Sequence, residues 1–446
     1  MLRAKRHLER LIIGTASALA ISAPLAGAQI LEVGPNVLAM AAPAWGALVE
    51  PHLAAHPTMP GHLVAAVMVA DTAGAPSPEA HCATLLSTDG GRTWASERQP
   101  LVSCADPWVT VTGSGEVVFA GLGMHAVVGW PGAMGLVVAR SPDGGRTWND
   151  TLVGLGRGHD RETMVADPRP DARRSVVLFS GLGLKLDDGP LRWSVYIARS
   201  VDAARTFREP VKVLPSNLNL NAEEGVVLHD GTILASFVDF QRNVDNFRGR
   251  DGMLQRRRIW MLRSTDDGRT FSPPLFVTEH CGRSAYDVAA DASAGPARGR
   301  VFLVCRTLDG GGILIHHSND RGETWSAPRL VSADTAGAFR TQPRLAVNRS
   351  GTVAVAWLDG GRDTSGACYR VMIAVSRDGG ASFAAPAAVS PRTCPDVARN
   401  GFAMRRWPQG GDYFGLVAAA DGRFHAMWTD ARRGPFELFT ASVAVR

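Results

Sequence analysis

Acidic, arginine and tyrosine residues recur at the beginning of seven apolar segments of this 446-residue chain. Paired carboxylates supply the acid and the base of many hydrolytic reactions, a tyrosine hydroxyl can act as a nucleophile, and arginine binds anionic groups. The residues are Glu50, Asp106, Asp160 with Arg161 and Glu162, Glu223 with Glu224, Arg283 with Tyr286 and Asp287, Arg340 with Gln342 and Arg344, and Asp412 with Tyr413. Solvated strand ends also contain such residues, so their chemistry depends on whether the fold brings the seven segments together.

Each of these segments is the first of two apolar stretches separated by a turn, as in EEGVVLHDG followed by TILASFVDF. Such a pair predicts two antiparallel strands. The seventh pair, residues 412–430, has a third apolar stretch after it, FELFTASVAV. The sequence therefore predicts seven similar units built of β-strands.

A short phrase follows six of the seven pairs, in forms such as STDGGRTW at residues 87–94 and SNDRGETW at residues 318–325. Its aspartates, which lie 54 to 64 residues apart, are Asp89, Asp143, Asp202, Asp266, Asp320 and Asp378. This period is typical of a repeated supersecondary unit. Aspartate accepts hydrogen bonds from the backbone of a turn and glycine supplies a positive φ. We therefore expect these aspartates to stabilise strand-joining turns rather than to perform chemistry.

The phrase resembles the Asp-box (S-x-D-x-G-x-T-W), or BNR repeat, of sialidases and their relatives, and its six copies extend from residue 87 to residue 383. The resemblance implies an all-β propeller with the box between the third and fourth strands of a blade. It does not imply sialidase activity by itself, because one fold hosts many functions. With the seven strand pairs, it predicts a seven-bladed propeller of four-stranded antiparallel blades; a six-bladed sialidase-type propeller is the alternative.

Closure of the ring needs a fourth strand for the seventh unit. We predict that residues 29–40 (QILEVGPNVLAM) supply it, which would protect two sheet edges. The first strand of each blade lines the channel of a propeller, so the seven polar strand starts should form a ring at one channel mouth.

Sialidases use a tyrosine and glutamate pair as nucleophile and base and an aspartate as acid. The stretch NAEEGVVLHDGTILASF resembles the family strand with the catalytic glutamate, which implies Glu223 or Glu224. The stretch GDYFGLVAAADGRFHAMW resembles the strand with the nucleophile, which implies Tyr413. Asp106 and Asp160 are both candidates for the acid.

Sialidases also bind the substrate carboxylate with three arginines. Substrate-binding candidates here are Arg161, Arg283, Tyr286, Arg340 and Arg344, and Tyr286 is the second candidate for the nucleophile. The family begins with an arginine in a short F/Y-R-I-P phrase, whereas this chain has no arginine or lysine between Arg10 and Arg92.

Two classes of function follow. One is a secreted sialidase-like exo-glycosidase with an incomplete catalytic set. The other is a non-catalytic propeller that binds a glycan or protein. An arginine-rich stretch, residues 241–258, could steer an anionic glycan toward the channel.

The N-terminus has the pattern of a secretory signal peptide, with a basic start, an apolar run and the small residues Ala26-Gly27-Ala28. Cleavage there gives a signal peptide (1–28) and a propeller domain (29–446), secreted or periplasmic. The apolar run is shorter than the ~20 residues of a membrane span. Cleavage removes four basic residues and one acidic residue, so the net charge falls from +5 to +2, which gives no argument for nucleic-acid binding.

All six cysteines lie after residue 28. Three of them, Cys104, Cys281 and Cys394, follow the aspartates of their boxes by 15, 15 and 16 residues. We predict disulfides Cys82–Cys104 and Cys368–Cys394 within units and, by elimination, Cys281–Cys305. No phosphate-binding loop, dinucleotide fingerprint, GxSxG or HExxH motif is present, so neither a cofactor nor a metal is expected.

Overall fold

The structure is a computed structural model, and it describes residues 31–73, 80–124, 135–149, 152–185, 191–213, 220–239, 257–282, 286–332, 337–363 and 367–446. The predicted signal peptide, Arg283 and residues 241–256 of the arginine-rich stretch lie outside these ranges.

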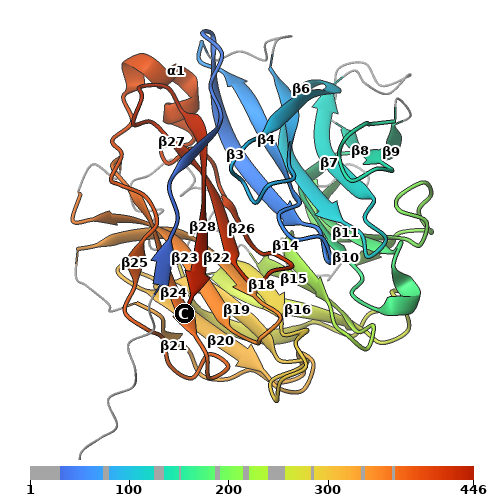
Figure 1. Cartoon of the computed structure of the whole chain (residues 1–446). Coiled ribbons are helices and arrows are strands. Elements are labelled where there is room, and N and C mark those ends of the chain that lie inside the picture. Colours follow the sequence, from blue (N-terminus) through green and yellow to red (C-terminus); the bar gives the residue numbers. More distant parts are fainter. Residues whose placement is uncertain are drawn as a thin grey trace, which may run out of the picture.

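Seven blades of four antiparallel strands form a β-propeller (Figure 1), which confirms the predicted fold and sets aside the six-bladed alternative. Blade I contains β3 (Gly46–Ala55), β4 (Leu63–Asp71), β5 (His81–Ser87) and the first part of β6 (Ala95–Val111). Blade II contains the second part of β6, β7 (Val117–Met124), β8 (Gly135–Ser141) and β9 (Val153–Arg157). Blade III contains β10 (His159–Ala166), β11 (Val176–Lys185), β12 (Leu191–Ser200) and β13 (Val211–Val213), with a 3-10 turn (Pro170–Ala172) after β10.

The remaining four blades follow in chain order. Blade IV contains β14 (Leu220–Val227), β15 (Ile233–Asp239), β16 (Arg257–Ser264) and β17 (Leu275–Cys281). Blade V contains β18 (Asp287–Ala290), β19 (Val301–Arg306), β20 (Ile313–Ser318) and β21 (Arg329–Leu330). Blade VI contains β22 (Phe339–Val347), β23 (Val353–Gly361), β24 (Arg370–Ser376) and β25 (Ala387–Ala388). Blade VII contains β26 (Gly415–Ala418), β27 (Phe424–Asp430) and β28 (Glu437–Val445), with β1 (Leu31–Val33) and β2 (Val37–Met40) at its outer edge.

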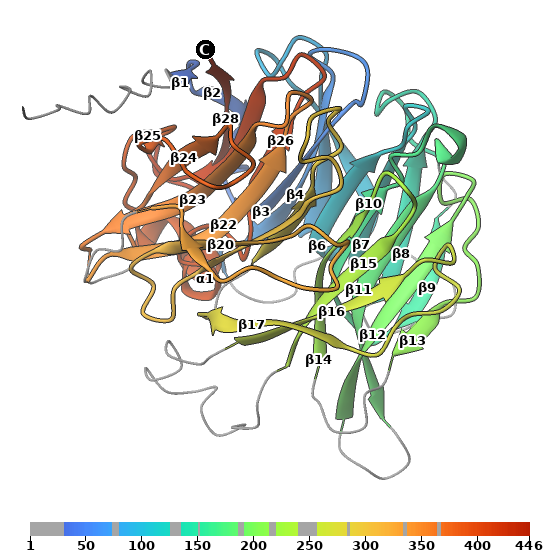
Figure 2. The same ribbon diagram turned by 90° about the horizontal axis from the view of Figure 1, so that it is seen from below.

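The ring is closed by the N-terminal strands. Both β1 and β2 pair antiparallel with β28, and Figures 1 and 2 show the blue strands beside the red one. The inner strands also contact one another all the way round, in the order β3, β6, β10, β14, β18, β22, β26 and back to β3. The prediction that residues 29–40 complete the seventh blade is thus confirmed for its described part, residues 31–40.

The six repeated phrases form the turns between the third and fourth strands. In the first copy, Asp89 Oδ1 accepts hydrogen bonds from the backbone N–H groups of Arg92 and Thr93, each at 3.0 Å, and from the Ser87 hydroxyl at 2.9 Å. The Thr93 hydroxyl donates to Asp89 Oδ2 at 2.7 Å. The aspartates of the other five copies accept equivalent bonds. These aspartates therefore stabilise turns, as predicted.

Apolar clusters between neighbouring blades hold the ring together. Trp357 and Trp428 are fully buried, and one cluster joins blades VI and VII through Tyr369, Phe414 and Trp428. Another joins blades II and III. Each blade is thus stabilised by burial against both neighbours, which favours a closed ring.

One element was not predicted, the helix α1 (Val397–Arg406) between blades VI and VII. Asp396 caps it by accepting a hydrogen bond from the Ala398 N–H. Ala403 and Trp407 pack on Ala47 of β3. The helix covers one end of blade I.

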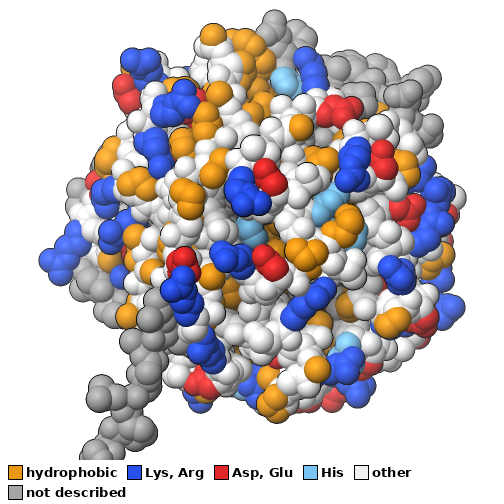
Figure 3. Space-filling view, viewed as in Figure 1, with side chains coloured by type: hydrophobic (Ala, Val, Ile, Leu, Met, Phe, Trp, Pro, Cys, Tyr) orange, Lys and Arg blue, Asp and Glu red, His pale blue; other side chains and the backbone are white. Residues whose placement is uncertain are grey.

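All three predicted disulfides are present, Cys82–Cys104, Cys281–Cys305 and Cys368–Cys394. The second joins β17 of blade IV to β19 of blade V. Disulfides are typical of extracellular or periplasmic proteins. Within the described ranges, no helix is long and apolar enough to cross a membrane. Basic and acidic side chains are interspersed on the face seen in Figure 3.

Candidate active site at the channel mouth

The inner strands of five blades carry a β-bulge where the sequence places acidic and arginine residues. The pairing with the second strand is interrupted between Val49 and His52, Ala105 and Trp108, Asp160 and Thr163, Ala222 and Gly225, and Thr341 and Arg344. A bulge bends its strand and redirects its side chains. Because equivalent strands begin at the same end of the ring, the bulges bring their polar residues to one channel mouth.

Four of the bulge residues have an unusual backbone conformation. Positive φ angles occur at Glu50 (56°), Asp106 (50°), Arg161 (54°) and Gln342 (50°). Residues with a Cβ rarely adopt this conformation, which costs on the order of 1 to 3 kcal/mol each. In three of the bulges the next residue is proline, which has no N–H to lose from the ladder. Repeated strain at one ring is typical of a functional site.

Glu50 and Asp106 are a hydrogen-bonded pair of carboxyl groups from neighbouring blades. Burial and the charges of Asp106 and Asp412 raise the pKa of Glu50 well above its ordinary value. Burial also raises the pKa of Asp106, although the Arg161 N–H donates to its Oδ2 at 3.3 Å. Two carboxyl groups form a hydrogen bond only when one is protonated, so this pair holds a shared proton and has the character of a proton donor.

Glu162 is a buried carboxyl group beside this pair. It is 1% exposed, and neither carboxyl oxygen has a hydrogen-bond partner in another residue that the structure describes. Burial raises its pKa well above the ordinary value, and the charges of Asp106 and Asp160 add to the effect. Buried acceptors of this kind need a donor, which a bound ligand can provide.

Arg161 and Arg344 neutralise part of this buried negative charge. Arg161 Nη2 lies 2.9 Å from Glu223 Oε2. Arg344 Nη1 lies 2.9 Å from Glu224 Oε1, and its Nε lies 3.3 Å from Asp287 Oδ2. Burial is the main reason that the pKa of Glu224 is raised to about 7. The charge of Arg344 lowers this pKa, and the charge of Asp287 raises it. Both arginines are therefore engaged within the ring.

Tyr413 lies directly before β26, with its ring edge toward Trp108 at 5.6 Å between centroids. Its hydroxyl donates to the Pro107 carbonyl oxygen at 3.2 Å. Burial raises the pKa of Tyr413 well above 10, and the charges of Glu50 and Asp106 raise it further. The hydroxyl is thus protonated here, and it becomes a nucleophile only by giving its proton to a neighbouring carboxylate.

Trp108 connects the aromatic and charged groups of the site. Its indole stacks on His52 at 3.6 Å between centroids, and Arg344 lies over the indole at 5.7 Å. Burial and the Arg344 charge hold the pKa of His52 well below its ordinary value, so its imidazole is neutral. The neutral stack fixes one side of the Arg344 guanidinium.

The structure brings most of the predicted site residues to this ring, and Asp160 is exposed at its edge. Two predicted residues have other contacts. Arg340 Nε lies 3.0 Å from Asp359 Oδ2 in β23 of its own blade. The buried Tyr286 hydroxyl donates to Ser236 Oγ at 2.9 Å. Arg283 lies outside the described residues.

The catalytic and substrate-binding residues predicted from the sequence do not include Glu50 and Glu162, although both were among the polar strand starts. His52 and Trp108 were not predicted at all. A signal for Glu50 was present, because its Glu-Pro dipeptide and the Asp-Pro dipeptide at Asp106 occupy equivalent places. Nothing in the local sequence distinguishes His52 or Trp108 from other apolar-strand residues.

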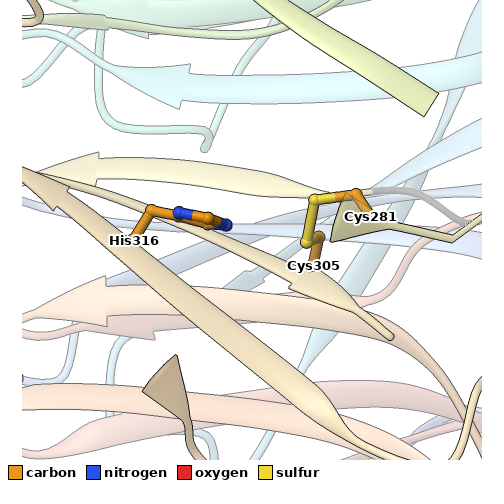
Figure 4. A group of neighbouring side chains, drawn as sticks. All are labelled: Cys281, Cys305 and His316. Carbon is orange, nitrogen blue, oxygen red and sulfur yellow. A yellow bond between two sulfur atoms is a disulfide. The ribbon is translucent and has the colours of Figure 1, made fainter. Parts of the chain in front are cut away.

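A second cluster lies away from the mouth, where Cys281, Cys305 and His316 come within 4.8 Å of one another (Figure 4). It is the only three-residue group of potential metal ligands within the described ranges. The two sulfurs form a disulfide, whereas metals bind the thiolate. The cluster is therefore a structural link between blades IV and V.

Comparisons with known proteins identify the class. No family model matches the sequence. The chain is 27% identical over 287 residues to a sialidase of Micromonospora viridifaciens, and the alignment covers 55% of this chain and 40% of that protein. The chain thus spans less than half of that relative's length. It is a sialidase-like β-propeller, consistent with the resemblance of its repeated phrases.

Solved structures agree on the fold. A protein of unknown function from Dyadobacter fermentans is similar with a TM-score of 0.51 and 16% identity, covering 93% of this chain and 99% of that one. The α-L-arabinofuranosidase of Fusarium graminearum, solved with arabinobiose, gives 0.50 and 13%, covering 77% and 98%. An α-L-arabinanase of Penicillium chrysogenum, also with arabinobiose, gives 0.50 and 14% with the same coverage. At these identities the likeness shows the β-propeller fold alone.

Proposed function

We propose that the protein is a secreted glycoside hydrolase that binds a sugar at the channel mouth and cleaves its glycosidic bond there. The observation that carries the proposal is the hydrogen-bonded pair Glu50 and Asp106, a proton donor held at the mouth of a sialidase-like propeller. Enzymes of this kind need one carboxyl group that is protonated when it meets the leaving oxygen. The signal peptide predicted from the sequence and the three disulfides support secretion.

The proposed roles follow from burial. The hydrogen bond raises the pKa of Glu50 and lowers that of Asp106, so the shared proton rests on the buried Glu50 and reaches the leaving oxygen through the partly exposed Asp106. Asp160, exposed at the edge, is the alternative acid. The hydroxyl oxygen of Tyr413 attacks the anomeric carbon while the ionised form of Glu162, whose charge is among those that act on Tyr413, takes the hydroxyl proton. Water, deprotonated by Asp106, then releases the sugar.

Glu223 and Glu224 have a different place in this proposal. The resemblance to sialidases puts one of them forward as the base. Each is ion-paired with a buried arginine, at 2.9 Å in both cases. We assign them to positioning Arg161 and Arg344, which contact the sugar.

A non-catalytic, glycan-binding propeller is the second candidate. The state of Tyr413 favours it, because a hydroxyl that donates to a backbone carbonyl and has a strongly raised pKa is unreactive. Such a protein would bind its glycan and never cleave it.

Hydrolysis of 4-methylumbelliferyl glycosides tests the proposal, with an α-L-arabinofuranoside and a sialoside as the first two substrates. We expect turnover by the wild type and a loss of about 100-fold or more in Asp106→Asn, as for removal of a general acid. Glu116→Gln is the matched control, since Glu116 is paired with Arg174 at the opposite end of the inner strands. Sugar binding without turnover of any glycoside would favour the binding propeller.

A further inference from the structure

We infer that the sugar recognised at this mouth is uncharged, and that an anionic sugar such as a sialic acid is disfavoured. This inference rests on the proposed function, because it concerns the ligand of the same site. The curated relative reported above is a sialidase, and an anionic sialic acid would need arginines that are free to bind it, whereas a neutral sugar would not.

Arg161 and Arg344 already have carboxylate partners within the described ring. Arg344 is ion-paired with Glu224 through Nη1 and with Asp287 through Nε, and its side chain is 5% exposed. Arg161 is bonded to Glu223 and is 13% exposed. An anionic sugar that replaced the carboxylate on either arginine would leave that carboxylate buried without its partner, which is strongly unfavourable.

The buried carboxyl groups Glu50 and Glu162 lie where a further negative charge is unfavourable. The charges of Asp106 and Asp412 raise the pKa of Glu50, and those of Asp106 and Asp160 raise the pKa of Glu162, although burial is the larger cause in both cases. These raised pKa values mean that the site already disfavours the ionised forms of its own carboxyl groups. A bound carboxylate would add to that charge in a poorly solvated place.

The site instead offers hydrogen-bond acceptors. Both carboxyl oxygens of Glu162 and Oε2 of Glu50 are buried without a partner in another described residue. A carboxyl group whose pKa is raised both donates and accepts once it is protonated, so a complementary ligand brings groups that do the same. The hydroxyl groups of a neutral sugar are such partners, and they add no charge.

A glycan array tests the inference, with the full secreted protein and its Asp106→Asn variant as probes. The array carries neutral glycans, arabinobiose among them, and anionic glycans, sialyllactose among them. We expect binding to neutral glycans only, followed by at least a tenfold loss of affinity for the best of them in Glu162→Gln. The control Glu116→Gln should bind like the wild type.

Binding of sialyllactose or another acidic sugar would overturn the inference. Absence of binding to every glycan would overturn it too. Because the array reads binding, its result is independent of turnover. Neutral binding without hydrolysis would uphold the inference and refute the proposed hydrolase, whereas hydrolysis of a sialoside would do the reverse.

Discussion

Replacing Glu224 with glutamine should stabilise the protein at neutral and mildly alkaline pH and leave it unchanged in acid. Glu224 is 3% exposed, and burial raises its pKa from 4.5 to about 7 despite the ion pair with Arg344. Between these values the folded protein holds a proton that the unfolded chain has lost. The free energy of unfolding therefore falls as the pH rises through this window.

The size of the effect follows from the shift. One pKa unit corresponds to about 1.4 kcal/mol, so the ionised Glu224 costs the folded state roughly 3 kcal/mol above pH about 7. Glutamine has a similar shape and no charge, and it avoids this cost. We expect Glu224→Gln to be more stable than the wild type by up to roughly 3 kcal/mol at about pH 8 and equal to it at about pH 4.

Urea unfolding followed by tryptophan fluorescence, repeated from about pH 4 to about pH 8, measures this difference. Glu116→Gln is the control with the opposite sign. Burial would raise the pKa of Glu116, but hydrogen bonds from Arg174 and Ser114 outweigh it and lower the pKa. That variant should lose stability at neutral pH and approach the wild type as the pH falls. A Glu224→Gln variant that is less stable than the wild type at about pH 8 would refute the reasoning, because the ion pair would then outweigh burial.

Three further predictions follow from the fold and the site. Tyr413→Phe should abolish glycoside turnover while sugar binding persists, since it removes only a hydroxyl; full turnover in this variant would exclude Tyr413 as the nucleophile. Replacing both Cys281 and Cys305 with serine should lower the free energy of unfolding by about 3 kcal/mol, because the bond spans a sequence separation of 24 residues, and an unchanged urea midpoint would contradict this. Deleting residues 31–40 should lower the melting temperature in calorimetry by exposing the edge of β28, and an unchanged value would show that β1 and β2 do not hold the ring closed.

Local patterns were sufficient to predict the architecture. A box turn is stabilised by side chains within eight residues of one another, as at Asp89, and a strand pair is visible in its own apolar stretches. Because the box turn occurs six times and the strand pair seven times, the repeats together predicted the fold more strongly than any single copy could. The disulfides could be predicted for the same reason, because cysteines at recurring positions in a repeat lie at recurring positions in space. The helix α1 interrupts the repeat, and its short sequence with an internal Gly401 gave no periodic signal.

The sequence by itself determined the blade count, the closure by the N-terminal strands, the disulfide pairing and the ring of polar residues, because these depend on short-range patterns and their spacing. Only the tertiary structure decided which side chains of the ring pair with one another. The Glu50 and Asp106 pair and the Arg344 bridge to Glu224 join different blades, and Glu162 is buried beside them with no partner in another described residue. The pKa shifts of these groups arise from burial that no single segment encodes. Bulges of one or two residues direct these side chains, and the apolar pattern of a strand does not show where such a bulge falls.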